Sequence, residues 1–373
     1  MRQVAISATG IYIPPHTISN EELVLSYNQY VQDFNQQHAS DIAAGTMTAL
    51  QESSVSFIEN ASGIKQRYVI EKTGILDPKR MYPHLPQRSN EEISLMAEIA
   101  AKAGADALEK LGKTGADVDG VICAASNMQR AYPAMAIEIQ QALGIGGFGF
   151  DMNVACSSAT FAIEQAVNAV RSGTARAVLV VNPEITSAHH AWADRDCHFI
   201  FGDVCTAVLV EAMENAPAGS YEVLGTKLTT VFSNNIRNNF GFMNRSEDSD
   251  PDARDKLFKQ EGRKVFKDVC PMAAEHMAKH LQSLNIDPAS GVRRYWLHQA
   301  NLSMNQLIAK KLLGSDVNED RAPTILDEFA NTASAGSIIA FHRHHSDFKA
   351  GDVGVICSFG AGYSIGSVIV RKT

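Results

Sequence analysis

Residues 148–170 read FGFDMNVACSSATFAIEQAVNAV and join a short apolar run to a helical pattern. The run at 148–154 predicts a buried strand that leads into a turn. From Phe161 onward, apolar residues recur at helical spacing, which predicts a helix. Cys156 stands between the two and is followed by four small residues. We therefore expect Cys156 at a strand-to-helix turn, with its sulfur near the first turn of the helix.

This position can activate a thiol. Unpaired N–H groups and the helix dipole at a helix N-terminus favour a thiolate over a thiol, and the small residues leave room for a substrate. The alternative is that Cys156 is a small buried apolar side chain, which is the commoner role of a free cysteine. This stretch alone leaves both interpretations open.

The composition excludes several classes of protein. The chain has 373 residues, 45% hydrophobic and 20% charged, which is typical of a globular protein with two domains or two halves. A net charge of −8 gives no support to nucleic-acid binding. Six cysteines without a C-x-x-C pair argue against a zinc site and a disulfide framework, and fit a reducing cytoplasm. No stretch approaches the roughly 18 consecutive apolar residues of a membrane span, and the N-terminus has no signal-peptide pattern.

The order of elements predicts an α/β protein. Strands are expected at 118–126, 176–182 and 353–358, a pair of strands at 199–212, and helices at 89–111, 133–143 and 261–284. Segment 201–210 resembles 359–370, and 153–163 resembles 331–341. These similarities predict two related halves, 1–213 and 214–373, with a site at their junction.

Three polar residues stand at the ends of predicted elements: Cys156, His298 and Asn331. Taken singly, His298 is most simply a core histidine and Asn331 a helix cap. Together they fit cysteine acyl chemistry, in which a thiolate attacks a thioester and neutral donors stabilise the oxyanion or enolate. Such a site needs no metal, and the sequence suggests none.

Seven motifs occur in an order that resembles the β-ketoacyl-[acyl carrier protein] synthase III family of the thiolase superfamily. They are 62–67 (SGIKQR), 155–157 (ACS), 201–203 (FGD), 262–267 (GRKVFK), 298–301 (HQAN), 331–335 (NTASA) and 358–362 (SFGAG). The resemblance covers nearly the whole chain. It implies a thiolase-like, five-layered αβαβα fold of two pseudo-repeated halves, with the nucleophile in the first half and the His and Asn in the second, usually as a homodimer.

The resemblance also implies roles for single residues. Cys156 would be acylated, and His298 and Asn331 would hold the malonyl thioester carbonyl and stabilise the enolate. The backbone N–H groups of Cys156 and Ala361 would form the oxyanion hole, although the family has Gly at the position of Ala361. No cofactor is implied, because acyl-CoA is a substrate.

Substrate contacts are implied in the same way. Arg195 matches a residue that contacts the CoA nucleotide, and Asn301 one near the pantetheine arm. Tyr132 matches an aromatic that reaches the partner subunit's acyl pocket, and Phe161 is expected in that pocket as well. Two residues depart from the family on the expected CoA side: Ala61 stands where the family often has a CoA-binding Arg, and Phe57 where it has Trp. These departures leave the CoA contacts and the acyl chain length open. Residues 28–56 and 244–256 are interpreted as added length.

The predicted carrier-docking surface is basic. Arg263, Lys264 and Lys267 would lie on one side of a helix at three- and four-residue spacing. They belong to a wider basic segment, 254–267, and acyl carrier proteins are strongly acidic. The alternative is an ordinary solvated helix face, and Ser303 has replaced a basic residue that would otherwise help.

The implied reaction is a decarboxylating Claisen condensation of an acyl-CoA primer with malonyl-acyl carrier protein, by way of an acyl-Cys intermediate. An alternative is a relative of the same fold that uses a different acceptor in secondary metabolism. A 3-hydroxy-3-methylglutaryl-CoA synthase-like reaction is not supported, because Ala155 stands where that reaction needs Glu. A non-catalytic scaffold would have lost the triad, whose three residues are all present.

Two other patterns resemble binding motifs. Residues 144–149 (GIGGFG) match G-x-G-x-x-G, but they follow a predicted helix and precede a strand, whereas dinucleotide binding needs the reverse order. We interpret them as a helix C-cap and turn. His342, His344 and His345 have no acid partner at ligand spacing and predict a solvated face.

Overall fold

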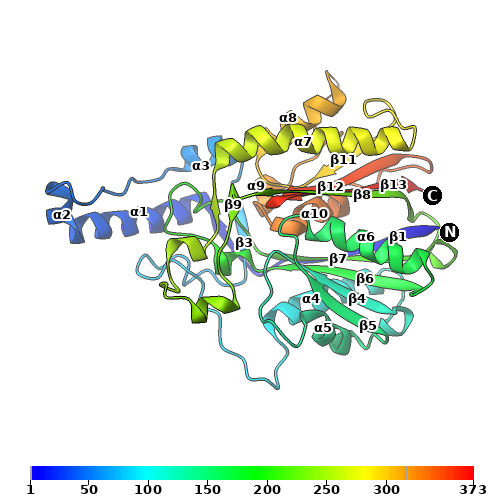
Figure 1. Cartoon of the computed structure of the whole chain (residues 1–373), viewed down its shortest axis with the longest axis horizontal. Coiled ribbons are helices and arrows are strands. Elements are labelled where there is room, and N and C mark those ends of the chain that lie inside the picture. Colours follow the sequence, from blue (N-terminus) through cyan, green and yellow to red (C-terminus); the bar gives the residue numbers. More distant parts are fainter. Residues whose placement is uncertain (1, 316) are drawn as a thin grey trace.

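A nine-stranded sheet runs through the computed structural model, which describes residues 2–315 and 317–373 (Figure 1). The strand order is β11-β12-β13-β8-β1-β7-β6-β4-β5. The bounds are β1 (Val4–Tyr12), β4 (Gly120–Ala124), β5 (Phe148–Met152), β6 (Ala177–Glu184), β7 (Val204–Ala212), β8 (Tyr221–Ser233), β11 (Arg294–Leu297), β12 (Val353–Gly360) and β13 (Gly362–Lys372).

The sheet divides into two layers where β8 meets β1. These two strands pair only at Ala5–Glu222 and Ile6–Tyr221. Strands β1 and β4–β7 form one layer, and β8 and β11–β13 form the other. The predicted boundary between halves, 213/214, falls between β7 and β8, inside η3 (Met213–Asn215). The division into two halves stays an interpretation.

Helices cover and separate the two layers. Helices α6 (Ser158–Arg171) and α10 (Gly336–Arg343) contact strands of both layers and therefore lie between them. Helices α4 (Leu95–Glu109) and α5 (Met135–Leu143) contact the outer face of the first layer. Helix α7 (Gly262–Ser283) contacts the second layer, and α8 (Leu302–Leu313) packs against α7. The predicted αβαβα fold is confirmed.

The composition of α6 explains why it can lie between two layers. Its buried positions are small or β-branched, among them Ala159, Ala162, Ala166, Val167 and Val170. These residues share one core with residues of both layers, such as Val180 and Ile356. Small side chains allow sheet and helix backbones to approach closely, so the helix that carries the nucleophile region is packed from two sides.

Two predicted elements differ from the structure. The helix expected from residue 89 begins at Leu95, where the Ser94 side chain accepts a hydrogen bond from the Ala97 N–H. The pair of strands expected at 199–212 is one strand, β7, preceded by an isolated bridge between Phe201 and Asn331. Just before β7, the Asp203 N–H donates to the Tyr68 carbonyl at 2.7 Å, outside the nine-stranded sheet.

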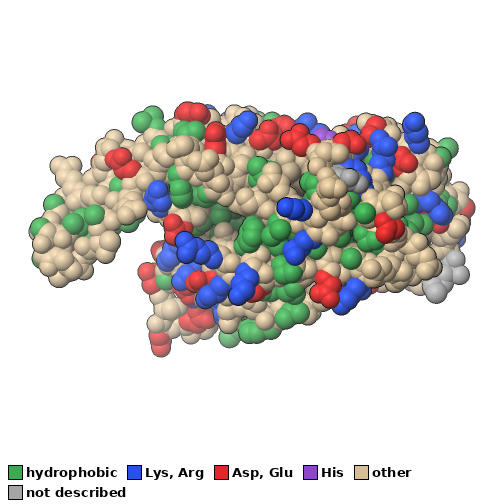
Figure 2. All heavy atoms as spheres, turned by 90° about the horizontal axis from the view of Figure 1, so that it is seen from above, with side chains coloured by type: hydrophobic (Ala, Val, Ile, Leu, Met, Phe, Trp, Pro, Cys, Tyr) green, Lys and Arg blue, Asp and Glu red, His purple; other side chains and the backbone are tan. Residues whose placement is uncertain are grey.

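An arm projects from the body (Figures 1 and 2). It consists of α1 (Asn20–Gln37) and α2 (Ala39–Ala43), followed by an irregular return to α3 (Val55–Ser62). The arm starts with a capping box between Ser19 and Glu22. The buried residues of α1 end at Val31, so the last six residues of the helix have no buried side chain. The remaining short elements are β2 (His16–Ser19), β3 (Gln66–Val69), β9 (Ile236–Arg237), β10 (Lys259–Gln260) and α9 (Leu326–Phe329).

No helix within residues 2–315 and 317–373 combines the length and apolar character that crossing a bilayer requires.

Candidate active site

Cys156 lies in a tight turn between β5 and α6, as predicted. Ala155 adopts the left-handed conformation, with φ of 47°. The Asn153 side chain accepts a hydrogen bond from the Ala155 N–H at 2.8 Å, and the Ser157 N–H donates to the Val154 carbonyl at 3.0 Å. These local bonds hold a backbone conformation that is uncommon for a residue with a Cβ.

The end of β12 brings the nucleophile and the histidine together. A Cβ added to Gly360 would lie 2.6 Å from the Cβ of Cys156, so only glycine allows this close approach. The neighbouring Phe359 ring contacts the His298 ring edge to face, with centroids 5.2 Å apart. The His298 N–H donates to the Cys357 carbonyl at 2.7 Å, which extends the pairing of β11 with β12.

Asn331 joins the site through both its backbone and its side chain. Its N–H donates to the Ile200 carbonyl at 2.9 Å, and its carbonyl accepts from the Gly202 N–H at 3.1 Å. The side-chain oxygen accepts from the Ala333 N–H at 2.9 Å. This bond leaves the amide NH2 as the group that can donate to a ligand. Ala333 also lies beside the His298 ring, where its backbone affects the pKa of the imidazole.

Electrostatics in the site differ from the prediction for Cys156. Burial raises the pKa of the Cys156 thiol to about 12, and the Glu184 charge acts in the same direction. Hydrogen bonds from the N–H groups of Cys156 and Ala361 lower the pKa but do not compensate. The expected thiolate is therefore wrong for the resting site. Desolvation of a buried anion exceeds the favourable effect of the helix terminus.

His298 is neutral in this environment. Burial lowers the pKa of its imidazole to about 4, opposed only by the Ala333 backbone. His298 is 2% exposed and Asn331 is 6% exposed. The site therefore presents two neutral hydrogen-bond donors next to a thiol. Neutral donors suit the stabilisation of an oxyanion or enolate that forms during reaction.

The structure adds Glu184, which the sequence analysis did not identify. Glu184 ends β6 and is 1% exposed. Its carboxylate accepts hydrogen bonds from the backbone N–H groups of Ser126 and Ser334, at 3.0 and 3.1 Å, and from both of their hydroxyl groups. Burial raises the pKa of this carboxyl to about 7 despite the four donors.

The Glu184 network connects the two halves of the site. Ser334 follows Asn331, and the Ser126 carbonyl accepts from the Asn153 side chain at 2.9 Å. Glu184 thus links the turn that carries Cys156 to the segment that carries Asn331. The available sequence signal was an acidic residue at the end of an otherwise apolar strand, although it did not reveal the partners of Glu184.

Two predicted CoA contacts lie together around α3. The Arg195 guanidinium lies 4.0 Å from the centroid of the Phe57 ring, and its Nε donates to the Glu52 carbonyl at 2.8 Å. The Asn301 amide donates to the Ala61 carbonyl at 2.5 Å, and its oxygen caps the N-terminus of α8. The departures at Phe57 and Ala61 thus contact the two residues whose CoA roles the resemblance implies, and those roles stay predictions.

The remaining predicted residues are placed as follows. Tyr132 is 85% exposed, in the loop before α5. Phe161 is partly buried on α6. Arg263, Lys264 and Lys267 are exposed at the start of α7, and Lys264 lies 3.7 Å from Glu261. Two members of the wider basic segment are occupied elsewhere: Arg254 pairs with Asp194 at 2.5 Å, and Lys256 with Glu247 at 2.9 Å.

The structure also bears on the two patterns that resemble binding motifs, the glycine-rich segment 144–149 and the histidines at 342–345. Gly144 is the left-handed C-cap of α5, with φ of 66°, so that prediction is confirmed. The solvated histidine face is wrong for His342 and His345, which are half-buried and bonded to Thr9 and Tyr221. Within the described ranges, no three His, Cys, Asp or Glu side chains are placed to hold a metal ion. The absence of a cofactor stays a prediction.

Comparisons with known proteins identify the family. The family model described as 3-Oxoacyl-[acyl-carrier-protein (ACP)] synthase III matches residues 150–230, and its C-terminal counterpart matches 281–372. The chain is 59% identical over 348 residues to the β-ketodecanoyl-[acyl-carrier-protein] synthase of Pseudomonas aeruginosa, covering 93% of this chain and 99% of that protein. It belongs to the 3-oxoacyl-[acyl-carrier-protein] synthase III family. Members of this family are condensing enzymes of the acyltransferase type that act in fatty acid biosynthesis.

Other relatives agree with this assignment. The β-ketoacyl-[acyl-carrier-protein] synthase III of Bartonella henselae is 30% identical over 328 residues, 86% of this chain and 91% of that one. Among solved structures, the 3-oxoacyl-[acyl-carrier-protein] synthase III of Aquifex aeolicus superposes with a TM-score of 0.76 at 23% identity, over 99% of both chains. That similarity supports the fold.

Proposed function

We propose that this enzyme condenses an acyl-CoA primer with a malonyl-acyl carrier protein, through an acyl-Cys156 intermediate. The Cys156 sulfur attacks the primer thioester, forms a new thioester and releases CoA as its thiol. The malonyl group then loses CO2, and the resulting enolate attacks the acyl-Cys156 carbonyl. The C–S bond breaks, the β-ketoacyl-carrier product leaves, and Cys156 regains its proton.

The observation that carries the proposal is that Cys156 and His298 meet at the end of β12, while Asn331 bonds to Ala333, whose backbone lies beside the His298 imidazole. The N–H groups of Cys156 and Ala361 lie within reach of the sulfur, and this supports their use as donors to the oxyanion of the thioester. Neutral His298 and the free amide of Asn331 are available for the malonyl carbonyl oxygen. Removal of one such donor typically costs about 10²–10³ in kcat.

The name of the Pseudomonas aeruginosa relative suggests the primer. A β-ketodecanoyl product has ten carbons, and malonyl contributes two after loss of CO2. That relative's name therefore implies an eight-carbon primer, and its 59% identity to this chain supports the same class here. We propose a medium-length acyl-CoA as the primer.

A homodimer fits the exposed edge of the first layer. Strand β5 ends the sheet, and its Phe150 is 40% exposed. Ile137 and Tyr132, 49% and 85% exposed, belong to the adjacent α5 and the loop before it. An unpaired edge with exposed aromatic residues is suited to pairing with a second copy. In that arrangement Tyr132 would reach the acyl pocket of the partner.

Intact-mass measurement after exposure to acyl-CoAs of increasing length tests the proposal. The enzyme should gain one acyl group, and Cys156→Ala should gain none. Cys357→Ala is the matched control, because Cys357 is fully buried nearby on β12 and should not be acylated. An acyl gain on Cys156→Ala, or no gain on the native chain with any primer, would rule out the acyl-Cys156 route.

A further inference from the structure

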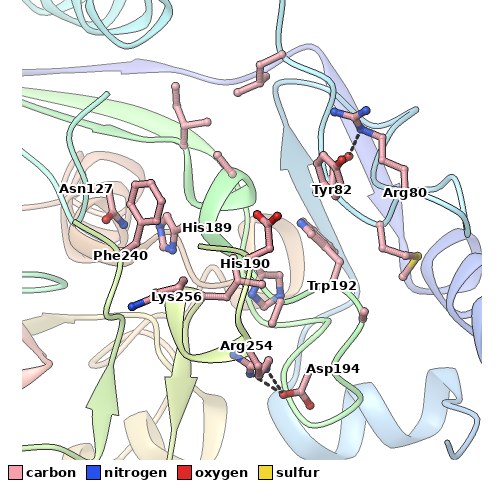
Figure 3. Close-up of a pocket in the computed structure, with 18 of the residues that line it drawn as sticks. Arg80, Tyr82, Asn127, His189, His190, Trp192, Asp194, Phe240, Arg254 and Lys256 are labelled. Atoms are coloured by element: carbon pink, nitrogen blue, oxygen red, sulfur yellow. Dashed lines mark hydrogen bonds and ion pairs between the residues drawn. The ribbon is translucent and has the colours of Figure 1, made fainter. Parts of the chain in front are cut away.

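A cavity of about 1250 Å³ lies between the arm and the body, and Ser126 and Glu184 are among the residues that line it (Figure 3). Because both residues belong to the network that links the Cys156 turn to the Asn331 segment, this cavity is part of the site already described. A second cavity, of about 320 Å³, has no lining residue from that network. Ligand pockets commonly measure about 300–1,000 Å³, so this second space suits a small molecule.

The second cavity lies along a free edge of β1. Pairing between β1 and β8 ends at Ile6 and Tyr221, where β8 begins, so in the described chain β1 has no paired strand on this side beyond Ile6. The Lys110 side chain, at the end of α4, reaches this edge and donates to the Thr9 carbonyl at 3.1 Å. The lining residues fall within 6–9, 110–111, 219–221 and 341–345. They thus come from both sides of the predicted boundary at 213/214.

Two histidines, at and just after the end of α10, line the cavity. The His342 Nδ1 is hydrogen-bonded to the Thr9 hydroxyl at 2.7 Å, and the His345 Nδ1 lies 3.3 Å from the Tyr221 hydroxyl. Nδ1 is therefore the occupied nitrogen in both rings. Among the described residues neither Nε2 has a protein partner, and neither is closed off from solvent. Two imidazole nitrogens are thus available to a ligand in this cavity.

The Tyr221 hydroxyl fixes the tautomer of His345. Its proton goes to the backbone carbonyl of His345 at 2.8 Å, because this is the shorter of its two bonds. The 3.3 Å contact is then a hydrogen bond that the His345 Nδ1–H donates to the hydroxyl oxygen. In the neutral ring, Nε2 therefore carries a lone pair and can only accept a hydrogen bond. It becomes a donor when the ring is protonated.

Two lysines stand beside this pair of rings. Lys110 lines the cavity, and the Lys372 Nζ lies 4.5 Å from the centroid of the Tyr221 ring, which also lines it. Lys110 is paired with Asp106 at 2.8 Å, whereas Lys372 donates to the Gly219 carbonyl. In the part of the chain that the structure describes, no carboxylate pairs with Lys372. The wall therefore has one positive charge that a carboxylate does not balance.

Both imidazoles are neutral at physiological pH. Burial lowers the pKa of His342 to about 4, and burial likewise lowers the pKa of His345. An anion beside the rings would raise these pKa values and favour protonation. The charged groups that face the two rings are Lys110 and Asp106 from the end of α4, Arg343 and Asp347 from α10 and the turn after it, and Lys372 from β13.

We propose that this cavity, termed here the β1 cavity, binds a small ligand with a phosphoryl or carboxylate group, and that His345 takes up a proton when the ligand binds. Both groups offer an anionic oxygen, which accepts hydrogen bonds from imidazole N–H and ammonium groups. Neutral His345 presents only a lone pair to such an oxygen, so its Nε2 gains a proton from solvent. No covalent bond forms or breaks. The inference does not depend on the proposed reaction, because none of the reacting residues lines the β1 cavity.

Protection from diethyl pyrocarbonate tests the site. This reagent acylates accessible, unprotonated imidazoles, so peptide mass mapping should find His342 and His345 labelled in the native enzyme. Sulfate represents a phosphoryl group and succinate a carboxylate ligand, with chloride at the same ionic strength as the reference for screening. At about nine times Kd, at least one of the two anions should slow labelling of both histidines about 10-fold. Labelling of His84, exposed elsewhere, should stay unchanged.

A matched pair of variants separates the site from general charge effects. Lys110 and Lys102 each pair with a carboxylate four residues earlier, at 2.8 and 2.5 Å, but Lys102 does not line the cavity. Lys110→Met should raise Kd for the protecting anion about 10-fold, since a hydrogen bond from a charged group is lost. Lys102→Met should leave Kd within about 2-fold.

The proton has its own test. Calorimetric titration with sulfate, which keeps its charge from pH 8 to 6, should show Kd falling at least about 3-fold per pH unit in the native enzyme. His345→Gln retains a donor but cannot take up a proton, so this dependence should be lost while binding remains.

Three results would overturn the proposal. They are no protection by either anion beyond that of chloride, an equal effect of Lys110→Met and Lys102→Met, and a pH dependence of Kd that His345→Gln leaves unchanged. Protection by sulfate alone would assign a phosphoryl ligand, and protection by succinate alone a carboxylate ligand.

Discussion

Glu184→Gln should remove a pH-dependent part of the stability of the enzyme. Burial raises the pKa of Glu184 from 4.5 to about 7. Because the folded pKa is the higher one, the stabilisation is fully present below pH 4.5 and is lost as the pH rises to about 7. A difference of about 2.5 units corresponds to about 3 kcal/mol. Between pH 4.5 and 7.5, the free energy of unfolding of the native chain should therefore fall by about 3 kcal/mol more than that of Glu184→Gln.

Glutamine can keep the geometry of the network. Its carbonyl oxygen can accept from the two N–H groups and the Ser334 hydroxyl that now bond Oε1, while its NH2 donates to the Ser126 hydroxyl oxygen. The variant therefore changes the charge at position 184 with little change in shape. Buried groups present in both proteins, such as Asp203, whose pKa is raised to about 6, cancel in the difference.

Urea unfolding of both proteins at matched concentration, from pH 4.5 to 8, measures the effect. Matched concentration is needed because association contributes to apparent stability. Parallel stability curves for the two proteins would refute the reasoning.

The reactivity of Cys156 gives a second readout. Loss of the neighbouring negative charge should lower the pKa of the Cys156 thiol. Iodoacetamide should therefore label Cys156 faster at pH 8 in Glu184→Gln but not in Ser334→Ala.

Two further predictions concern the proposed reaction. His298→Ala should still take up an acyl group from acyl-CoA but lose condensation by about 10²–10³-fold, since the donor serves the enolate; equal loss in single-turnover acylation and in condensation would contradict this division. Combined Lys264→Glu and Lys267→Glu should raise KM for malonyl-acyl carrier protein and weaken its salt dependence, while acylation by acyl-CoA stays near normal. Lys279→Glu, near the other end of α7, is the matched control, and unchanged carrier kinetics at low ionic strength would rule out docking at this helix.

Local patterns were sufficient for the Cys156 turn and for most elements. The apolar run before Cys156, the small residues after it and the helical spacing from Phe161 all act within one continuous stretch. The position of α7 was predicted nearly to the residue for the same reason. His298 and Asn331 were found because their motifs are short and continuous, although neither residue is informative alone.

Features that depend on distant partners were missed. Glu184 binds Ser126 and Ser334, which lie 58 and 150 residues away in the sequence. Its side chain at the end of an apolar strand therefore gave no local sign of four hydrogen bonds. His342 was expected on a solvated face, but its side chain is half-buried and forms a hydrogen bond with Thr9 of β1. The arm could not be placed from the sequence, because its buried residues end at Val31 and the rest of α1 and α2 has no buried side chain.

The error in the charge of Cys156 has a consequence for the mechanism. The helix-terminus argument considered one favourable contribution, whereas burial and Glu184 both oppose the thiolate. The resting pair is therefore a neutral thiol and a neutral imidazole, since the pKa of His298 is lowered to about 4.

A cationic histidine would stabilise an enolate more strongly, but it could also transfer a proton to the carbanion and end the reaction without a new C–C bond. Two neutral donors, His298 and Asn331, can hydrogen-bond to the enolate oxygen without readily giving up a proton. Burial thus makes Cys156 harder to ionise and, by the same physical cause, would keep the enolate of the proposed reaction available for condensation.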